Sequence, residues 1–401
     1  MQLPLDEFDR VFLIAAGKAA IDMGAALEEI AGQRLSSGIA VTKHGHATKP
    51  LKKIRVMEAG HPIPDLAGME ASQAVAEMLQ QLNARDLLLT AISGGASALL
   101  PSPAEPVNLE AKQKATGLLL RAGANITELN AVRKHLSKLK GGGLAALAYP
   151  ATVVSLLLSD VIGDPLDVIG SGLTAPDPST FTDAIHVLEK YSLLDCVPRE
   201  IRRHLQAGAA GKIPETPKPG DPIFKNVHNV LIGSNRRALE AAAGQAKSLG
   251  YKPLILSSTI DGETREAARV HAQILREVVN SGHPVARPAC LLSGGETTVT
   301  VLGKGKGGRN QEFALAAALA IAGLPNALVF SAGTDGTDGP TDAAGAVATG
   351  ETVERARRLS LNAMQHLLDN NAYPFFAALR DLVTTGPTGT NVMDIHLLLA
   401  R

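Results

Sequence analysis

Short apolar runs that alternate with helical stretches constrain the fold of this chain more than any other feature. The runs are bounded by glycine or polar residues, and they lie at 10–16, 37–42, 53–59, 86–93, 151–159, 229–234, 253–258, 289–294 and 326–333. Continuous runs of this length are typical of strands buried on both faces. Helical stretches rich in Ala, Leu and Glu lie between many of them, such as 67–81, 236–248 and 263–279. The alternation predicts an α/β fold with open, mostly parallel sheets.

The length of the chain predicts two domains. It has 401 residues, and a single hydrophobic core stops growing at roughly 250 to 300 residues. The segment 211–222 contains four prolines in a polar setting and can continue neither a helix nor a central strand. We therefore expect one domain at 1–222 and another at 223–401, with the ligand cleft between them.

Charge and cysteine content exclude several classes of function. The 39 basic and 39 acidic residues balance, so no overall field attracts nucleic acid or an anionic membrane. Cys196 and Cys290 are far apart and neither forms a C-x-x-C pair, which argues against a disulfide framework or a thiolate zinc site. The N-terminus has acidic residues before a short apolar run, unlike a signal peptide. We expect a soluble, cytoplasmic protein that binds small molecules. The sequence does not decide between a monomer and a homodimer.

The segment 297–319 passes from β-branched alternation into a glycine-rich loop and then into an apolar helix. We expect a strand before the loop, and the glycines then match the G-x-G-x-x-G pattern of a dinucleotide turn: Gly303, Gly305 and Gly308. The loop also carries cations where such a turn is usually small and neutral: Lys304, Lys306 and Arg309. No acidic residue follows about twenty positions later to bind a ribose. The loop therefore favours a triphosphate or a carboxylate over NAD, with an exposed turn as the alternative.

Two cations are predicted to lie at helix starts. Arg309 falls in the first turn of the helix after the glycine-rich loop, and Lys18 follows the first strand and Gly17. A cation there opposes the helix macrodipole unless an anion lies between them. Both are therefore candidates for anion binding. Lys18 does not fit the Walker pattern, because Ala19 follows it and no glycine lies five residues before Gly17, and an ordinary solvated lysine is the alternative.

Other candidate residues follow predicted strands. The motif "ISGGAS" places small residues where backbone N–H groups approach an oxyanion: Ser93, Gly94, Gly95 and Ser97. "SGGE" repeats the pattern in the second half, where Glu296 is within reach of a metal or a ribose. Asp335 and Asp338 supply oxygen ligands of the kind that Mg²⁺ prefers, and Asp164 follows the strand at 151–159. Ordinary turn chemistry is the alternative for these loops.

Seven motifs in series resemble one family. In chain order they are "AAGKAA", "GHPIPD", "ISGGASALLPSP", "LNAVRKHLSKLKGG", "SDVIGDPLDVIGSGLTAPDPST", "LSGGETTVTVLGKGKGGRNQEFAL" and "SAGTDGTDGPTDAAGA". Over nearly the whole chain they resemble the class II glycerate kinases, the MOFRL family. The resemblance implies a Rossmann-like doubly wound N-terminal domain and a smaller α/β C-terminal MOFRL domain. It also implies phosphorylation of glycerate, usually at the 2-hydroxyl, with ATP and Mg²⁺.

The resemblance also assigns roles to residues. The family's essential lysine falls on Lys18 and its essential arginine on Arg309. Acidic roles fall on Asp164 and Asp335, and Ser93–Gly95 match a glycine-rich loop for substrate or phosphate. The chain departs from the family pattern in two places: it begins almost at its first strand, and it has "SGLT" where "SGPT" is usual.

These residues suggest a mechanism. Backbone N–H groups near Ser93–Gly95 hold the carboxylate of glycerate, and the ATP phosphates lie along 304–309. Lys18 and Arg309 neutralise the transferring phosphoryl group, and Asp164 accepts the hydroxyl proton. Two alternatives stay open: a hydroxypyruvate reductase that uses NAD(P)H at the glycine fingerprint, and a non-catalytic sensor of an organic acid or nucleotide.

Overall fold

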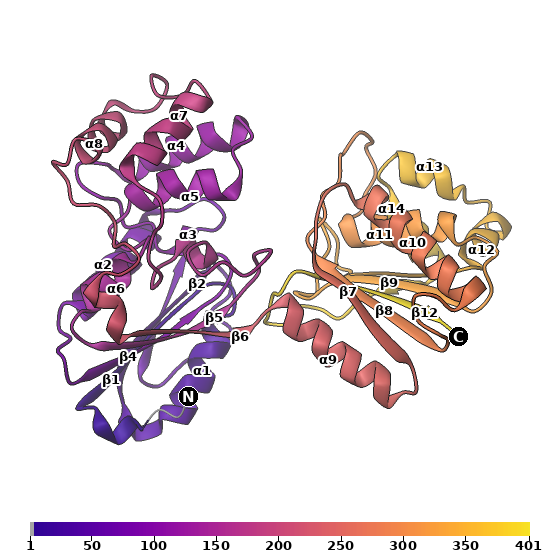
Figure 1. Cartoon of the computed structure of the whole chain (residues 1–401), viewed down its shortest axis with the longest axis horizontal. Coiled ribbons are helices and arrows are strands. Elements are labelled where there is room, and N and C mark those ends of the chain that lie inside the picture. The colour runs from indigo at the N-terminus through magenta and orange to yellow at the C-terminus, as the bar shows by residue number, and fades with distance from the viewer. Residues whose placement is uncertain (1–3) are drawn as a thin grey trace. The chain divides into compact units, whose positions relative to one another are not determined.

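The computed structural model describes residues 4–401, so the first three residues of the predicted domain 1–222 lie outside it (Figure 1). The chain divides into two compact units. Unit 1 comprises the residues up to Ser159 together with 164–232, and unit 2 comprises 160–163 together with 233–401. No helix among residues 4–401 is long and apolar enough to span a membrane.

Unit 1 is built on a six-stranded sheet with the strand order β3-β2-β1-β4-β5-β6. Its strands are β1 (Arg10–Ala16), β2 (Leu35–Lys43), β3 (Ile54–Ala59), β4 (Asp86–Ile92), β5 (Thr152–Leu158) and β6 (Val227–Gly233). The ladders that join β1 to β2 and β4, β2 to β3, and β4 to β5 are parallel. This is the order of a doubly wound sheet, in which successive strands are added toward one edge from β1 to β3 and toward the other edge from β4 onward. The strand order therefore reverses between β1 and β4. The α/β class with two domains is thus confirmed.

The helices of unit 1 pack in more than one apolar core. They are α1 (Ala20–Ala31), α2 (Leu66–Leu79), α3 (Ala96–Leu99), α4 (Leu109–Arg121), α5 (Ile126–His135), α6 (Gly143–Ala148), α7 (Phe181–Lys190) and α8 (Arg199–Ala209). Alternate residues of β1 and β4, such as Leu13 and Leu89, pack against Ile21 and Leu27 of α1. Helices α4, α5, α7 and α8 surround a separate apolar core and form a group of their own in Figure 1.

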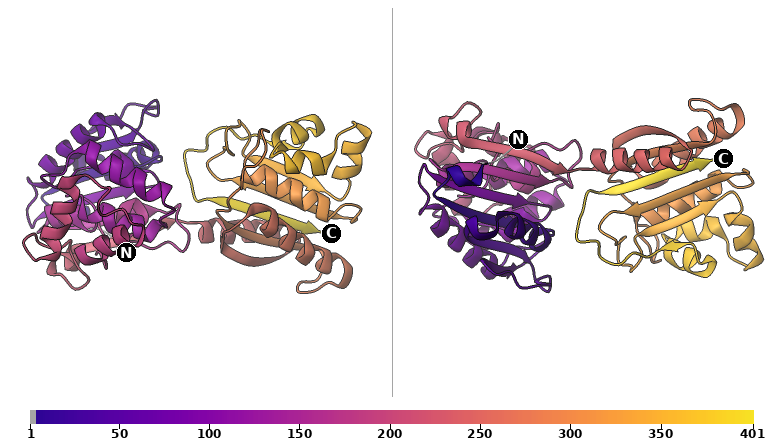
Figure 2. Two further views of the ribbon diagram at one scale, coloured as in Figure 1. Left: turned by 90° about the horizontal axis from the view of Figure 1, so that it is seen from above. Right: turned by 90° about the horizontal axis from the view of Figure 1, so that it is seen from below.

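Unit 2 has a six-stranded sheet in the order β11-β10-β9-β12-β8-β7. The strands are β7 (Lys252–Ile260), β8 (Ala289–Gly295), β9 (Ala327–Gly333), β10 (Gly345–Thr349), β11 (Leu382–Val383) and β12 (Asp394–Ala400). The helices are α9 (Asn235–Ser248), α10 (Thr264–Ser281), α11 (Arg309–Ala320), α12 (Thr352–Arg358), α13 (Ala363–Leu368) and α14 (Ala372–Leu379). Helix α9 covers one face of the sheet, and the main apolar core lies on the other face under α10 and α11 (Figures 1 and 2).

The expectation of mostly parallel sheets is wrong for unit 2. Only β7 and β8 pair in parallel, whereas β12 is antiparallel to both β8 and β9, and β10 is antiparallel to β9. A loop without a helix joins β9 to β10, and such a connection gives an antiparallel pair. The C-terminal strand β12 lies in the centre of the sheet between β8 and β9. No local sequence pattern predicts these partners.

Two further differences concern the region that carries the candidate residues. No strand forms at 297–302, because the ladder of β8 with β12 ends at Gly295 and Asp394, and Val301 and Leu302 are exposed. The strand context that a dinucleotide turn requires is therefore absent before the glycine-rich loop. The division between the units also lies after residue 232, not at 222, since β6 joins the sheet of unit 1.

Candidate active site

The loops after β1 and β4 meet at the point where the sheet of unit 1 changes direction. Ser93 donates its N–H to the Ala16 carbonyl at 2.9 Å, and Lys18 donates its N–H to the Gly94 carbonyl at 2.9 Å. The Ser93 hydroxyl accepts the N–H of Ala19 at 3.0 Å. Ligands of doubly wound sheets bind outside the carboxyl ends of the strands at this point. The structure therefore brings two of the predicted motifs together.

Gly17 makes this close approach possible. Its φ is +125°, and a Cβ there would lie 2.2 Å from the Ser93 hydroxyl. A side chain would force the two loops apart. Lys18 itself is half-buried and lies just before α1, which begins at Ala20 without a side-chain cap.

Gly95 connects these loops to a cavity. A Cβ built on it would lie 3.0 Å from the His61 ring and 3.6 Å from Cγ of Lys18. Gly95, His61 and Ser97 line a cavity of about 590 Å³ that lies within unit 1. Burial lowers the pKa of His61, and the positive charges of Lys18 and Lys43 lower it further.

Asp164 lies in the segment after β5. It has a φ of +54°, a conformation that is uncommon for residues other than glycine. Its Oδ1 is buried and has no hydrogen-bond partner within residues 4–401. A buried acceptor without a partner is costly, and such a group at a loop is a candidate for contact with a ligand.

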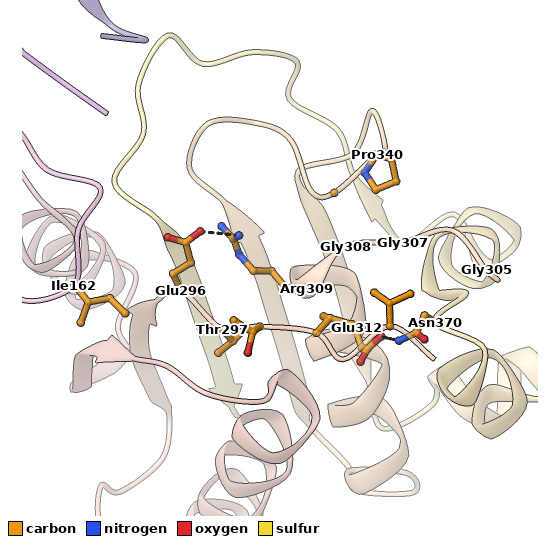
Figure 3. Close-up of a pocket in the computed structure, with 14 residues that line it drawn as sticks. Ile162, Glu296, Thr297, Gly305, Gly307, Gly308, Arg309, Glu312, Pro340 and Asn370 are labelled. Atoms are coloured by element: carbon orange, nitrogen blue, oxygen red, sulfur yellow. Dashed lines mark hydrogen bonds and ion pairs between the residues drawn. The ribbon is translucent and has the colours of Figure 1, made fainter. Parts of the chain in front are cut away.

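Arg309 begins α11 in unit 2, as predicted, and two carboxylates hold it, of which Figure 3 shows Glu296. Its Nε and Nη2 donate to the two oxygens of Asp394 at 2.5 and 3.1 Å. Its Nη1 lies 2.8 Å from Glu296. The Asp394 side chain is fully buried, while the Arg309 side chain is 33% exposed. The two ion pairs raise the pKa of Arg309 although burial opposes them.

A second aspartate explains how a cation is tolerated at the start of α11. Both oxygens of Asp338 accept backbone N–H groups from the first turn, one from Asn310 at 3.0 Å and one from Gln311 at 2.8 Å. Asp338 thus supplies the anion that the helix dipole requires. Asn310 links it to Asp394, to which its side-chain amide donates at 2.9 Å. Burial, with Asp394 nearby, raises the pKa of Asp338 to about 6.

The glycine-rich loop is packed against the segment 369–371. The N–H groups of Leu302 and Gly303 both donate to the side chain of Asn370 at 2.9 Å. The N–H groups of Lys304 and Gly305 donate to Asp369, and that of Lys306 donates to the side chain of Asn371. Gly303 and Gly305 leave no room for a Cβ against that segment. These five N–H groups are therefore engaged within the protein, and the side chains of Lys304 and Lys306 are exposed.

The other side of the glycine-rich loop lines a cavity of about 720 Å³ within unit 2. Figure 3 shows Arg309, Glu296 and Thr297 at one part of it and Glu312 with Asn370 at another. Asp335 lies in the loop after β9, where its Oδ1 accepts the N–H and the hydroxyl of Thr337 at 3.0 Å. Within residues 4–401 no three His, Cys, Asp or Glu side chains gather as a metal cluster.

Comparison with known proteins identifies the family of the chain. Residues 1–206 match a domain family of unknown function, DUF4147, and residues 289–394 match the MOFRL family. The chain is 44% identical to a D-glycerate 2-kinase of Thermotoga maritima over 98% of its own length and 91% of the relative's. The chain belongs to the MOFRL family of glycerate kinases. This confirms the resemblance that the motifs carry.

Other members of the MOFRL family agree in sequence and fold. A glycerate 2-kinase of Pyrococcus horikoshii is 44% identical over 97% of this chain and 87% of its own length. The crystal structure of the Thermotoga maritima glycerate kinase superposes with a TM-score of 0.92 over 98% of this chain and 92% of that one. A putative hydroxypyruvate reductase of Agrobacterium vitis is also 41% identical over 99% of this chain and 89% of its own length.

Sequence analysis missed residues that the structure places beside the candidate side chains of this MOFRL protein. Asp394 begins β12, whose other residues are apolar except His396, and a single acid in such a strand was the available signal. Asn310 and His61 stand next to predicted residues but belong to no pattern that points to chemistry. Arg133 lies in the last turn of α5, where a cation is expected for the helix dipole, so no sequence signal distinguished it from a capping residue.

Proposed function

We propose that the chain is a glycerate kinase that transfers the terminal phosphoryl group of ATP to the 2-hydroxyl of D-glycerate with the help of Mg²⁺. Two relatives at 44% identity are a D-glycerate 2-kinase and a glycerate 2-kinase, which supports the acceptor and the 2-position. The observation that carries the proposal is the anchoring of Arg309 by the fully buried Asp394 beside the cavity of unit 2. Phosphoryl transfer requires fixed cations more than covalent chemistry.

The proposed roles follow the two groups of residues. The hydroxyl oxygen of glycerate forms a bond to the γ-phosphorus of ATP, the bond to the bridging oxygen breaks, and ADP leaves. Lys18 and Arg309 neutralise charge on the transferring group. Asp164, whose Oδ1 has no partner within residues 4–401, accepts the hydroxyl proton. That both units act in one reaction, across a cleft between the predicted domains, stays a prediction.

The nucleotide is proposed to bind in the cavity of unit 2. Its walls include Arg309, Gly307 and Gly308, and the N–H groups of residues 302–306 are engaged elsewhere. We therefore propose that the phosphates contact residues 307–309, the last part of the segment 304–309 that the sequence predicted. Glu296 holds Arg309 there at 2.8 Å.

Asp335 and Asp338 are the proposed protein ligands for Mg²⁺. The fit rests on their chemistry, since both are carboxylates, although both oxygens of Asp338 already accept N–H groups from the first turn of α11. Mg²⁺ commonly takes one or two carboxylates and completes its shell with phosphates and water. When bound, the ion would neutralise phosphate charge.

The test is product formation from D-glycerate, ATP and Mg²⁺, followed by phosphorus NMR, beside NADH oxidation with hydroxypyruvate. We expect a 2-phosphoglycerate signal and no loss of NADH. Reaction mixtures without MgCl₂ and with L-glycerate are the controls. NADH loss alone would establish the reductase, and binding of glycerate without turnover in either assay would establish a sensor.

A further inference from the structure

The cavity of unit 1 contains a cation that the mechanism above does not use. The cavity has a volume of about 590 Å³, and its walls come from the segment 61–64, the loop 95–101 and helices α4 and α5. Most of the lining is apolar, including Pro62, Ala98 and Leu129. Arg133 of α5 also lines it. A charged side chain in an apolar cavity calls for a partner.

Arg133 has a hydroxyl group as its partner instead of a carboxylate. Its Nη2 donates to the hydroxyl of Ser97 at 2.6 Å, and that hydroxyl also pairs with Ser171 at 2.7 Å. No carboxylate within residues 4–401 forms an ion pair with Arg133. The next residue, Lys134, shows the contrast, since it lies 2.9 Å from Asp167 and 3.2 Å from Asp177. Burial lowers the pKa of Arg133 to about 10.

Two lysines, Lys112 and Lys140, are buried near Arg133, and Lys112 also lines the cavity. Burial lowers the pKa of both lysines well below its usual value. Nζ of Lys112 donates to the carbonyls of Pro101 and Leu136 at 2.5 and 3.1 Å. Nζ of Lys140 donates to the carbonyl of Leu100 at 2.8 Å. Neither lysine forms an ion pair within residues 4–401. Their ammonium groups are engaged by carbonyls, whereas the guanidinium of Arg133 lines the cavity and is bonded to a neutral hydroxyl.

We propose that Arg133 binds the carboxylate of the acid substrate in the cavity of unit 1, a role that the sequence-based mechanism gave to backbone N–H groups near Ser93–Gly95. The planar guanidinium offers parallel donors that match a carboxylate, and the hydroxyl of Ser97 orients it. This inference rests on the proposed function and deepens it, because it names the residue that selects an acid over a neutral polyol.

The geometry favours a carboxylate over a phosphate chain. One guanidinium matches a singly charged group, whereas the phosphates of a nucleotide carry several charges and require more donors. The other cation of the lining, Lys112, already donates to two carbonyls. The rest of a bound acid would extend from Arg133 toward Gly95 and His61, which line the same cavity. Gly95 adjoins Lys18, the residue proposed to act on the phosphoryl group. Substrate selection and transfer would then share one loop.

The experiment uses the full chain with Arg133→Gln and Arg133→Lys. Removing a charge-assisted hydrogen bond to a ligand weakens binding by about 10- to 100-fold. We expect KM for glycerate to rise by that factor in Arg133→Gln, KM for ATP to stay unchanged, and Arg133→Lys to recover part of the loss. Arg203→Gln, an exposed arginine of α8 in the same unit, is the matched control and should keep wild-type constants.

Ligand-induced thermal shifts keep the test independent of turnover. Glycerate should raise the Tm of the wild type and not of Arg133→Gln, glycerol should raise neither, and ADP should raise both. Circular dichroism checks that the variants fold, and Ser97→Ala, which removes the hydroxyl that orients Arg133, gives a milder second variant with a smaller rise in KM.

The outcomes separate this inference from the proposed function. An unchanged KM and an unchanged glycerate shift in Arg133→Gln would overturn the inference while the kinase stands. Loss of the ADP shift with the glycerate shift retained would assign the cavity to phosphate and also overturn it. If the wild type forms no phosphoglycerate, the proposed function fails, and the thermal shifts still decide whether Arg133 binds a carboxylate.

Discussion

At the scale of single residues, Arg309 shows why a charge needs partners to be useful. An arginine at a helix start would be repelled by the dipole, yet Asp338 satisfies the N–H groups and Asp394 fixes the guanidinium. The guanidinium keeps one edge toward Glu296 and the cavity of unit 2. Preorganised cations of this kind cost no rearrangement at the moment of reaction.

We therefore expect Asp394→Asn to lower kcat by about 10- to 100-fold, because it replaces the charged acceptor that aligns Arg309. KM for glycerate should change little, since Arg309 is assigned to the phosphoryl group. The measurement is steady-state kinetics on the purified variant.

Asp381→Asn is the matched control for Asp394→Asn. This substitution also removes the carboxylate partner of an arginine, since Arg355 lies 2.9 Å from Asp381. Asp381 is not one of the candidate residues. The substitution should lower Tm without lowering kcat. Equal kcat for Asp394→Asn and the wild type would contradict the positioning role.

At the scale of elements, β12 and α11 form a buried polar contact in the core of unit 2. His396 of β12 stacks on Phe313 of α11 with ring centroids 4.0 Å apart. Its Nδ1 pairs with the Ser331 hydroxyl at 2.8 Å, and that hydroxyl donates to Asn310 at 2.6 Å. This network links the core of the sheet to the residue that follows Arg309. Packing of the strand and placement of the cation are therefore coupled.

This contact predicts a loss of stability in acid. Burial lowers the pKa of His396 from 6.5 to about 3. Between these two pH values His396 is therefore protonated in the unfolded chain and neutral in the folded chain. The free energy of unfolding should fall by up to about 1.4 kcal/mol per pH unit as the pH drops from 6.5 toward 3. Denaturant titrations of the wild type and His396→Phe from pH 7 to pH 4.5 test this.

His396→Phe should have a flatter pH dependence, because it removes the titrating group and keeps an aromatic ring against Phe313. His283→Gln, which replaces an exposed histidine before β8, is the control. Parallel curves for the wild type and His396→Phe would show that His396 does not titrate as its burial requires.

At the scale of the whole molecule, the question is whether the two groups of residues serve one reaction. Lys18 lies in unit 1 and Arg309 in unit 2. By analogy with oxyanion donors, Lys18→Ala and Arg309→Ala should each lower kcat by about 10²- to 10³-fold. If both act on the same phosphoryl group, their effects are not additive.

The double variant measures this coupling. If the two losses were independent, the kcat of the double variant would be reduced by the product of the two single-variant factors. We expect a kcat at least about tenfold higher than that, as found for groups that act as a unit. Product quantification by phosphorus NMR gives enough sensitivity at long incubation. Strictly multiplicative losses would indicate that the two cations act in separate steps.

Much of the fold could be predicted because buried parallel strands and their helices leave local signals. The run at 10–16 became β1, and the stretches at 236–248 and 263–279 became α9 and α10 with shifts of one or two residues. The strand expected before Gly303 did not form, since strands need a partner that no local pattern specifies. The sequence equally gave no sign that β12 runs between β8 and β9.

The sequence by itself determined the α/β class, the family and the positions of Lys18, Ser93 and Arg309 after strands or at a helix start, because these depend on local periodicity and on residue order. Only the tertiary structure decided what surrounds them. Asp338 and Asp394 come from distant loops and strands to hold the start of α11, and Asp369–Asn371 take the N–H groups of the glycine-rich loop. Arg133 was left without a carboxylate by packing alone. Charge compensation is a property of neighbours in space, and a chain reveals those neighbours only when it is folded.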